Sequence, residues 1–501
     1  MNDLVRVRER AWGDLGNGYY RNPVLNADYS DPDVIRVGDD FYMVCSDFHY
    51  MGMPVLHSKD LVNWTIIGKV YDRLDIDPRY SAMERYAHGS WAPALRFHDG
   101  RYYVYFCTPE EGLYMSNAEQ PAGPWTPLHE VKRVAGWEDP CPFWDEDGNA
   151  YLGHSTVGAG PILIHRMSAD GRSLLDDGVI VYVGKIAEGT KIYKRNGYYY
   201  LVIPEGGVEI GWQTVLRSRS LYGPYERKIT LQQGTTTVNG PHQGALVELE
   251  SGESWFLHFQ SAGAIGRVCH LQPVRWVDDW PVTGADGEPV AIYAKPCVGG
   301  SYLACLPQSS DDFDRPELGL QWQWNHNPVD DRWSLREKPG ALRLYARAAP
   351  NLLQARNTIT QKIMGTRGVY EIELGGFDGM KDGQRAGLAY LCFREDNWIG
   401  VVREEGRLFL RAVTEGRTHH GPELKGGVVW LGSTMNPDDE TRFQFSLDGR
   451  VYMPLGGACS MRAGFWKGAR IALFNYTIGE EGGSVDFRRF RFDPEGRLDD
   501  R

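Results

Sequence analysis

A short turn followed by an aromatic-rich strand recurs five times in the first half of the chain. The copies are DDFYMVCS (39–46), DGRYYVYFC (99–107), DGNAYLGHS (147–155), NGYYYLVIP (196–204) and SGESWFLHF (251–259). Asp-Gly and Asn-Gly between alternating apolar residues favour tight hairpins, because both central residues of such a turn take positive φ. The turns start at 39, 99, 147, 196 and 251, so successive copies lie 60, 48, 49 and 55 residues apart. This spacing is close to the roughly 40 to 50 residues of a four-stranded blade, and it predicts a five-bladed β-propeller.

The five repeats also share a register of polar and aromatic residues. Counting back eight positions from each turn gives Asp31, Trp91, Asp139, Glu188 and Gln243. An even offset keeps these side chains on one face of a strand, and the inner strands of a propeller surround its central channel. We therefore predict that three carboxylates and a tryptophan meet near one axis.

The pattern changes after a Gly-, Pro- and Ser-containing stretch at 295–310. Alternating strands follow, such as ALRLYAR (341–347), VYEIEL (369–374), GLAYLCF (387–393), WIGVVR (398–403) and RLFLRAV (407–413). Short antiparallel strands of this kind are typical of a β-sandwich of jelly-roll or lectin type. We predict an all-β chain with a propeller at 1–305 and a sandwich at 306–501.

Composition narrows the class of function. The chain has 501 residues, 66 of them acidic and 54 basic, and its formal net charge of −12 argues against a nucleic-acid partner. The chain contains no run of about 18 apolar residues, so no membrane span is predicted. The start of the chain also lacks the apolar stretch of a signal peptide. Its eight cysteines are scattered without a CxxC pair, which favours reduced thiols. We expect a cytoplasmic enzyme with no nucleic-acid or membrane partner.

Each carboxylate of the shared register also fits an ordinary turn residue. Asp31 stands in YSDPDV, Asp139 in EDP and Glu188 in EGTK. The common offset favours a functional set, because three unrelated turn residues have no reason to share a register with three hairpins. Glycoside hydrolysis needs one carboxylic acid to protonate the leaving oxygen and one carboxylate to activate water or attack the anomeric carbon. In a narrow channel the most desolvated carboxyl keeps its proton near neutral pH.

Three further candidates each have more than one interpretation. Trp91 in HGSWAP is either a core residue or an aromatic wall against the apolar face of a sugar. His242 in NGPHQG fits a buried structural histidine, a pocket residue or a ligand of an axial ion. Arg267 in AIGRVC fits a surface cation, or an arginine that holds a hydroxyl and lowers the pKa of the base.

With these residues in hand, most of 22–285 resembles glycoside hydrolase family 43. The resemblance rests on SDPDVIRVGDDFYM, EDPCPFWDEDGNAYL and EGTKIYKRNGYYYL. It implies a five-bladed propeller in which Asp31 is the general base, Asp139 modulates the pKa of the acid and Glu188 is the general acid. It also implies an inverting mechanism.

The same resemblance extends to binding residues. SDFHYMGMPVLHSKDLVNW and HGSWAPALRFHDGRYYVYF place Phe48 and Trp91 in the sugar pocket, and GRVCHLQPVRW carries the substrate-binding Arg267. His242 resembles an axial histidine that is associated in many members with a bound calcium or other ion. No cofactor is expected for the chemistry itself.

The C-terminal part is similar to the β-sandwich of the family's β-xylosidase and α-L-arabinofuranosidase branch, through 311–335 and 355–365. A sandwich loop in that branch can approach the mouth of the active site, and FNYTIGEE (474–481) is our candidate by order along the strands. Exo action on terminal α-L-arabinofuranosyl or β-D-xylosyl residues of plant cell-wall oligosaccharides is the implied activity. An exposed sandwich edge is compatible with a homo-oligomer.

Two alternative functions fit the same fold. A retaining fructosidase would use an aspartate nucleophile, but its usual Asn-Asp-Pro-Asn is replaced here by Ser30-Asp31-Pro32-Asp33. A sugar-binding propeller without turnover would not need an acid with a raised pKa. The choice between arabinose and xylose stays open, because it depends on loop geometry.

Overall fold

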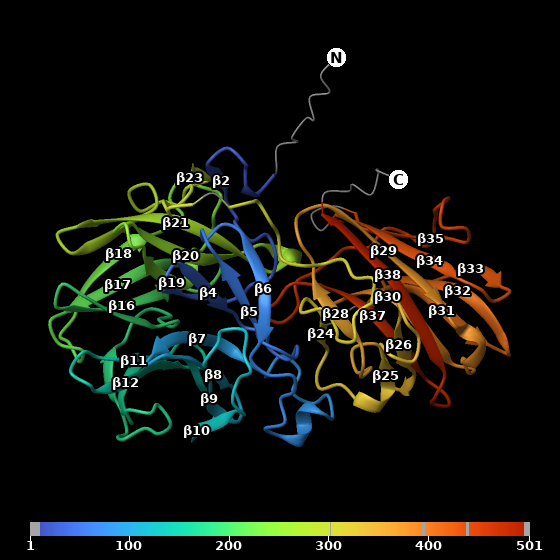
Figure 1. Cartoon of the computed structure of the whole chain (residues 1–501), viewed down its shortest axis with the longest axis horizontal. Helices are drawn as coiled ribbons and strands as arrows, with labels where there is room; N and C mark the ends of the chain where they lie inside the picture. The colour runs from blue at the N-terminus through green and yellow to red at the C-terminus, as the bar shows by residue number, and fades with distance from the viewer. Residues whose placement is uncertain (1–10, 301, 393–395, 437–439, 495–501) are drawn as a thin grey trace, which may run out of the picture.

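The computed structural model describes residues 11–300, 302–392, 396–436 and 440–494. Two all-β domains lie side by side, the first coloured blue to yellow-green and the second yellow to red in Figure 1. Within the described residues the first domain contains five four-stranded sheets, and the second contains two larger sheets. The all-β prediction is confirmed. No helix in the described part of the chain has the length and apolar character to span a bilayer.

Each four-stranded sheet uses four consecutive strands. They are β3 (Asp33–Val37), β4 (Asp40–Val44), β5 (Pro54–Ser58), β6 (Trp64–Lys69); β7 (Trp91–His98), β8 (Arg101–Thr108), β9 (Gly112–Ala118), β10 (His129–Arg133); β11 (Trp137–Trp144), β12 (Ala150–Thr156), β13 (Ile162–Met167), β14 (Val179–Tyr182); β15 (Lys191–Arg195), β16 (Tyr198–Glu205), β17 (Trp212–Ser218), β18 (Glu226–Leu231); β19 (His242–Glu248), β20 (Ser254–Ser261), β21 (Arg267–Val277), β22 (Trp280–Thr283).

The first strands of these sheets surround the axis of a propeller. Strand β3 contacts β7 and β19, strand β11 contacts β7 and β15, and the ring closes where β16 contacts β19. The five sheets correspond one to one with the five sequence repeats. Every repeat forms a hairpin between the first and second strands of its sheet.

The predicted turn geometry holds for two of the five hairpins. Asp99-Gly100 and Asn196-Gly197 are two-residue turns in which both residues have positive φ. The hairpins near 147 and 251 have five-residue loops instead, since Trp144 pairs with Ala150 and Glu248 with Ser254. Loops of this length do not require positive φ at both positions.

Several short elements complete the propeller and lead out of it. Strands β1 (Gly13–Asp14), β2 (Tyr19–Arg21) and β23 (Ile292–Ala294) form a small sheet, and the 3-10 helices η1 (Pro78–Tyr80) and η2 (Gly263–Ile265) lie in connections. The predicted domain boundary at 305 falls in the segment between β23 and the first sandwich strand.

The sandwich consists of two packed sheets. The first contains β24 (Gln323–Trp324), β28 (Ile359–Lys362), β37 (Arg470–Thr477), β30 (Gln384–Leu391), β31 (Asp396–Glu404), β32 (Arg407–Thr414) and β33 (Arg417–Leu424), with β27 (Arg347–Ala348) beside β37. The second contains β25 (Trp333–Ser334), β26 (Leu342–Tyr345), β38 (Ser484–Pro494), β29 (Gly368–Gly375), β34 (Val429–Met435), β35 (Arg442–Ser446) and β36 (Met453–Pro454). Helices η3 (Asp330–Arg332) and η4 (Phe377–Gly379) are single 3-10 turns.

The two domains share a buried interface. Apolar residues of the first blade, such as Trp64, belong to the same buried cluster as Trp322 of the sandwich. The carboxylate of Asp47 lies 3.0 Å from Lys362 and 3.3 Å from Arg470, and all three side chains are buried. Buried ions held across an interface fix its geometry, because separating them leaves charges without partners. The sandwich is therefore positioned rigidly beside the propeller.

Candidate active site

One cavity of about 530 Å³ gathers every candidate residue of the sequence. It is lined by Asp31, Phe48, Trp91, Asp139, Glu188, His242 and Arg267, together with Gln243 of the shared register. These residues come from all five blades. The structure therefore brings together the residues that the eight-residue offset and the family resemblance selected.

Irregular backbone aims the carboxylates into the cavity. Asp31 and Asp139 have φ of 53° and 56°, a conformation that is uncommon outside glycine. The pairing of β11 with β12 shifts register between Glu138 and Cys141, as at a β-bulge. Bulges and positive φ redirect side chains and are frequent next to active sites, where the surrounding fold must hold them.

Asp31 is held in place by an arginine and two serines. Its Oδ1 accepts a hydrogen bond from Arg267 Nη1 at 2.9 Å, and its Oδ2 accepts hydrogen bonds from Ser46 Oγ at 2.6 Å and Ser30 Oγ at 3.1 Å. The Asp31 side chain is buried, so this ion pair is little screened by solvent. Such partners orient the carboxylate to accept a proton from water.

Asp139 occupies a different environment. Its Oδ2 accepts hydrogen bonds from Gly189 N at 2.7 Å and Ser155 Oγ at 3.1 Å, and Gln243 Nε2 donates to Oδ1 at 3.3 Å. Burial, with the charges of Glu188 and Asp31 adding to it, raises the pKa of Asp139 to about 6. In this environment the charge of Asp139 interacts electrostatically with the carboxyl groups of Glu188 and Asp31.

Glu188 faces the cavity from the loop before β15. Its Oε1 lies 2.8 Å from His242 Nε2. Glu188 and Asp139 belong to a group of three carboxylates whose nearest oxygens lie within 4.8 Å of one another. Close carboxyl groups share protons, since ionising all of them at once is costly.

The surroundings of His242 fit the bound ion that the family resemblance implies. Its Nε2 is used by Glu188, while Nδ1 is buried and has no hydrogen-bond partner among the described residues. When Nε2 donates to the carboxylate, Nδ1 carries a free lone pair, which suits a water molecule or an ion. The residue therefore fits as a single nitrogen ligand.

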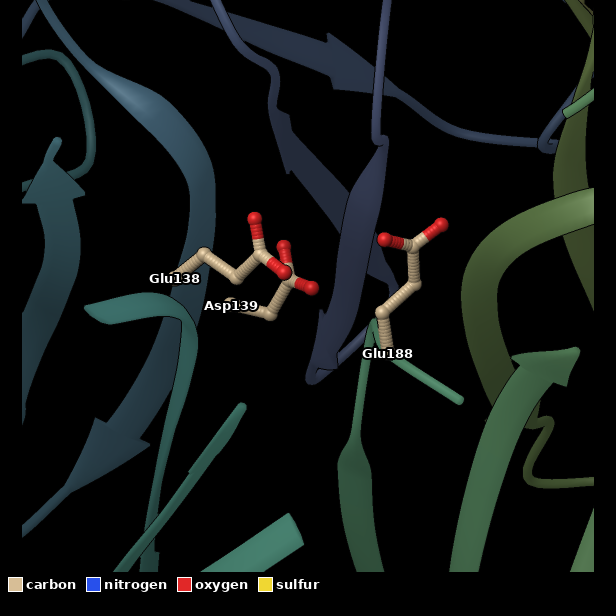
Figure 2. Close-up of side chains that lie close together, drawn as sticks. All are labelled: Glu138, Asp139 and Glu188. Carbon is tan, nitrogen blue, oxygen red and sulfur yellow. The ribbon is translucent and has the colours of Figure 1, made fainter. Parts of the chain in front are cut away.

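Glu138 is a functional-site residue that the sequence patterns did not reveal. It lines the cavity, and its carboxyl group lies beside that of Asp139, opposite Glu188, as Figure 2 shows. Burial, with the charges of Asp139 and Glu188 adding to it, raises the pKa of Glu138 to about 9. Strand alternation would direct neighbours such as Glu138 and Asp139 to opposite faces. The irregular backbone of β11 removes that alternation, so no periodic signal could have found Glu138.

Aromatic side chains form the walls of the cavity. The rings of Phe48 and Trp91 are 6.1 Å apart in an edge-to-face arrangement. Trp91 Nε1 donates a hydrogen bond to Ala87 O at 2.7 Å, which fixes the indole. Flat apolar surfaces beside polar groups are typical of sugar sites, where C–H faces pack on rings and hydroxyls find polar partners.

The sandwich contributes the remaining wall through Phe465 and Trp466. Both are partly exposed, and the Arg267 guanidinium lies 5.5 Å from the Trp466 ring. The prediction that 474–481 approaches the mouth is wrong. Its first four residues are buried in β37, which is paired on both sides within its sheet. The sandwich segment that lines the cavity is instead the connection before β37.

A buried clamp holds this connection against the propeller. Lys467 Nζ lies 2.7 Å from His49 Nδ1 and 4.2 Å from the centre of the Tyr86 ring. His49 Nδ1 also accepts a hydrogen bond from Ala87 N, so its Nε2 carries the proton and donates to Asn325 at 2.8 Å. Because Lys467 follows Trp466 and His49 follows Phe48, the clamp sets the distance between two walls of the cavity.

The arrangement can hydrolyse a glycosidic bond. It combines the Asp31 carboxylate, which is paired with Arg267, with a cluster of further carboxyl groups and aromatic walls, and proton transfer between such groups needs no metal. A five-sheet propeller carrying such a site is a glycosidase by fold and chemistry.

Comparison with known families gives the same result. The family model for glycosyl hydrolases family 43 matches residues 20–281, and the model for the beta xylosidase C-terminal Concanavalin A-like domain matches residues 310–493. The first match covers more than half of the chain. The chain therefore belongs to glycosyl hydrolase family 43.

Individual relatives match most of the chain. A Xylanibacter ruminicola protein, provisionally named a β-xylosidase, is 52% identical over 481 residues, which are 94% of this chain and 88% of that protein. A non-reducing end α-L-arabinofuranosidase of Bacteroides ovatus is 34% identical over 67% of this chain and 66% of its own length. The solved structure of a bifunctional GH43-CE protein of Bacteroides eggerthii has a TM-score of 0.84 and 31% identity, covering 95% of this chain and 64% of that longer protein.

Proposed function

We propose that this glycosidase is an inverting, exo-acting enzyme that releases terminal β-D-xylosyl or α-L-arabinofuranosyl residues from plant cell-wall oligosaccharides. The observation that carries the proposal is the cavity itself. Three blades supply the three differently supported carboxylates, and Trp466 of the sandwich adds a wall to the cavity. A wall on that side favours binding of a chain end, whereas an endo-acting enzyme needs an open cleft.

In the proposed mechanism, Asp31 is the general base. Its carboxylate accepts a proton from the water that attacks the anomeric carbon, and Arg267 and Ser46 hold it in place. Glu188, which lines the same cavity, protonates the leaving oxygen as the bond breaks. Asp139 adjusts the proton affinity of Glu188 through its nearby charge. Phe48 and Trp91 hold the sugar ring between these groups.

The names of relatives support a pentose substrate and favour xylose. The 52% identical relative carries a β-xylosidase name, and the matched C-terminal model describes a beta xylosidase domain. The Bacteroides ovatus relative supports arabinofuranose as the second candidate. Both sugars are small and neutral, as the cavity requires.

The direct test is hydrolysis of aryl β-D-xyloside and aryl α-L-arabinofuranoside by the purified protein. We expect turnover of the xyloside to be the faster reaction, and the first-formed anomer followed by NMR to be inverted. Retention of configuration would instead favour the fructosidase-like mechanism with Asp31 as nucleophile. Release of only long oligosaccharides from polymers would contradict exo action.

Two further properties belong to this proposal. The eight cysteines are all unpaired, which supports function in a reducing cytoplasm on short oligosaccharides. The free Nδ1 of His242 supports an axial ion, calcium or another, as a structural addition. Melting of chelator-treated protein with and without added Ca²⁺ tests the ion, and light scattering tests whether the chain forms a homo-oligomer.

A further inference from the structure

Glu138 is the cavity carboxyl that the proposed mechanism does not use. It is only 6% exposed, and Oε1 accepts one hydrogen bond, from Ala159 N at 3.1 Å. Its other oxygen has no hydrogen-bond partner among the described residues, although Glu138 borders the cavity. No described cation forms an ion pair with Glu138. A carboxyl oxygen that borders a cavity and has no protein partner is open to a hydrogen bond with a ligand or a water molecule.

The surroundings determine which member of the carboxyl cluster keeps a proton. Asp139 accepts three hydrogen bonds, and the buried Lys191 further favours its charged form. Glu138 accepts a single hydrogen bond and faces the negative charges of Asp139, Glu188 and Asp31. Hydrogen bonds to a carboxylate stabilise its charge, so the proton of the pair belongs on Glu138.

A neutral carboxylic acid would complete the set of groups that a sugar needs. Asp31 and Asp139 offer carboxylate oxygens that accept hydrogen bonds, so sugar hydroxyls have acceptors here. Donors that point into the cavity are fewer, because Trp91 Nε1 is used by Ala87 and one guanidinium nitrogen of Arg267, Nη1, is used by Asp31 and Ser30. The O–H of a protonated glutamate supplies a donor without adding negative charge.

We propose that Glu138 is a substrate-binding residue whose neutral carboxylic acid donates a hydrogen bond to a hydroxyl of the bound glycoside next to the scissile bond. The placement follows from the distances, since the Glu138 carboxyl lies within 4.8 Å of that of Glu188, the group that protonates the glycosidic oxygen. The inference rests on the proposed function, because the ligand is the substrate of that reaction.

The test compares Glu138→Gln with Glu138→Ala in hydrolysis of aryl β-D-xyloside from pH 5 to 9. An amide has the shape of the neutral acid and can donate, so Gln should lower kcat/KM by only about threefold. Ala removes the donor and should raise KM by about tenfold, with a smaller change in kcat. The alkaline limb of the Gln profile should move by less than about half a pH unit, because no charge is removed.

Other results overturn the proposal. A loss beyond about a hundredfold in the Gln variant, or an alkaline limb displaced by about one pH unit, would mean that Glu138 works as an anion. An Ala variant with unchanged KM and kcat would mean that Glu138 does not touch substrate. A Ca²⁺-dependent rise in melting temperature that Glu138→Gln abolishes would identify an ion ligand instead.

Sugar binding separates this inference from the proposed function. Xylose and arabinose are titrated into the wild type and both variants, with tryptophan fluorescence as the readout. If the wild type hydrolyses neither glycoside, the proposed function fails. Weaker binding in Glu138→Ala, restored in Glu138→Gln, would still support the hydrogen bond, whereas equal binding in all three proteins would overturn it.

Discussion

The propeller and the sandwich contribute different chemistry to the same cavity. Among the described lining residues, every ionisable group belongs to the propeller, whereas the sandwich provides only Phe465 and Trp466. Five inner strands converge on one axis, so their polar side chains meet at short distances. Among the described residues of the sandwich, only the connection before β37 lines the cavity, while β28 and β37 contact the propeller elsewhere. The groups that transfer protons therefore belong to the propeller, whereas the sandwich shapes access to the cavity.

The largest effect should follow removal of the propeller carboxylates. We expect Glu188→Ala, Asp31→Ala and Asp139→Asn each to lower kcat/KM for the faster aryl glycoside by roughly a thousandfold or more, because each loses a proton-transfer or charge function. Glu250→Gln, at an exposed turn, is the matched control and should behave like the wild type. Activity within tenfold of wild type in any of the three variants would remove that residue from the mechanism.

A large loss of stability should follow disruption of the interface between the domains. Asp47→Ala leaves Lys362 and Arg470 buried without their partner, and we expect the free energy of unfolding to fall by about 3–5 kcal/mol. Denaturant unfolding of the wild type and the variant measures this difference in the free energy of unfolding. The control is Asp312→Ala, which breaks a surface ion pair with Arg491 and should cost no more than about 1 kcal/mol. If both variants lost the same free energy of unfolding, the buried ion pairs of Asp47 would not help to join the domains.

The sandwich wall should affect binding more than chemistry. We expect Trp466→Ala to raise KM for xylobiose by about tenfold while kcat stays within about threefold, since an aromatic contact is lost and no proton donor is changed. Trp466→Phe keeps a ring and should recover most of the affinity. A hundredfold fall in kcat would mean that Trp466 takes part in the chemical step, contrary to the division between the domains.

The smallest effect concerns the pH dependence of stability. Because the folded-state pKa of Glu138 is raised to about 9, its contribution to stability is present at low pH and is lost as pH rises from about 4.5 toward 9. Glu138→Gln removes this loss, so its melting temperature should exceed that of wild type by about 2–4 °C at pH 8 and match it at pH 4. A constant difference at both pH values would show that Glu138 is ionised in the folded protein.

The five repeats and the eight-residue offset were readable in the sequence, because tight turns and strand alternation are local properties. They were sufficient to predict the propeller and to select Asp31, Asp139 and Glu188. The wrong prediction that 474–481 approaches the mouth of the cavity had a different origin. Strand order alone does not show which connection of a sandwich lies nearest to a neighbouring domain, and the wall is made by Phe465 and Trp466 instead.

The sequence by itself determined the all-β class, the repeat, the axial carboxylates and the family. Only the tertiary structure decided that Glu138 joins them, since its direction depends on the register shift in β11 and on the positive φ of Asp139. The clamp between Lys467 and His49 likewise joins residues 418 positions apart. Local patterns record preferences of neighbouring residues, whereas contacts between distant segments, and the pKa values that depend on them, exist only when the chain has folded.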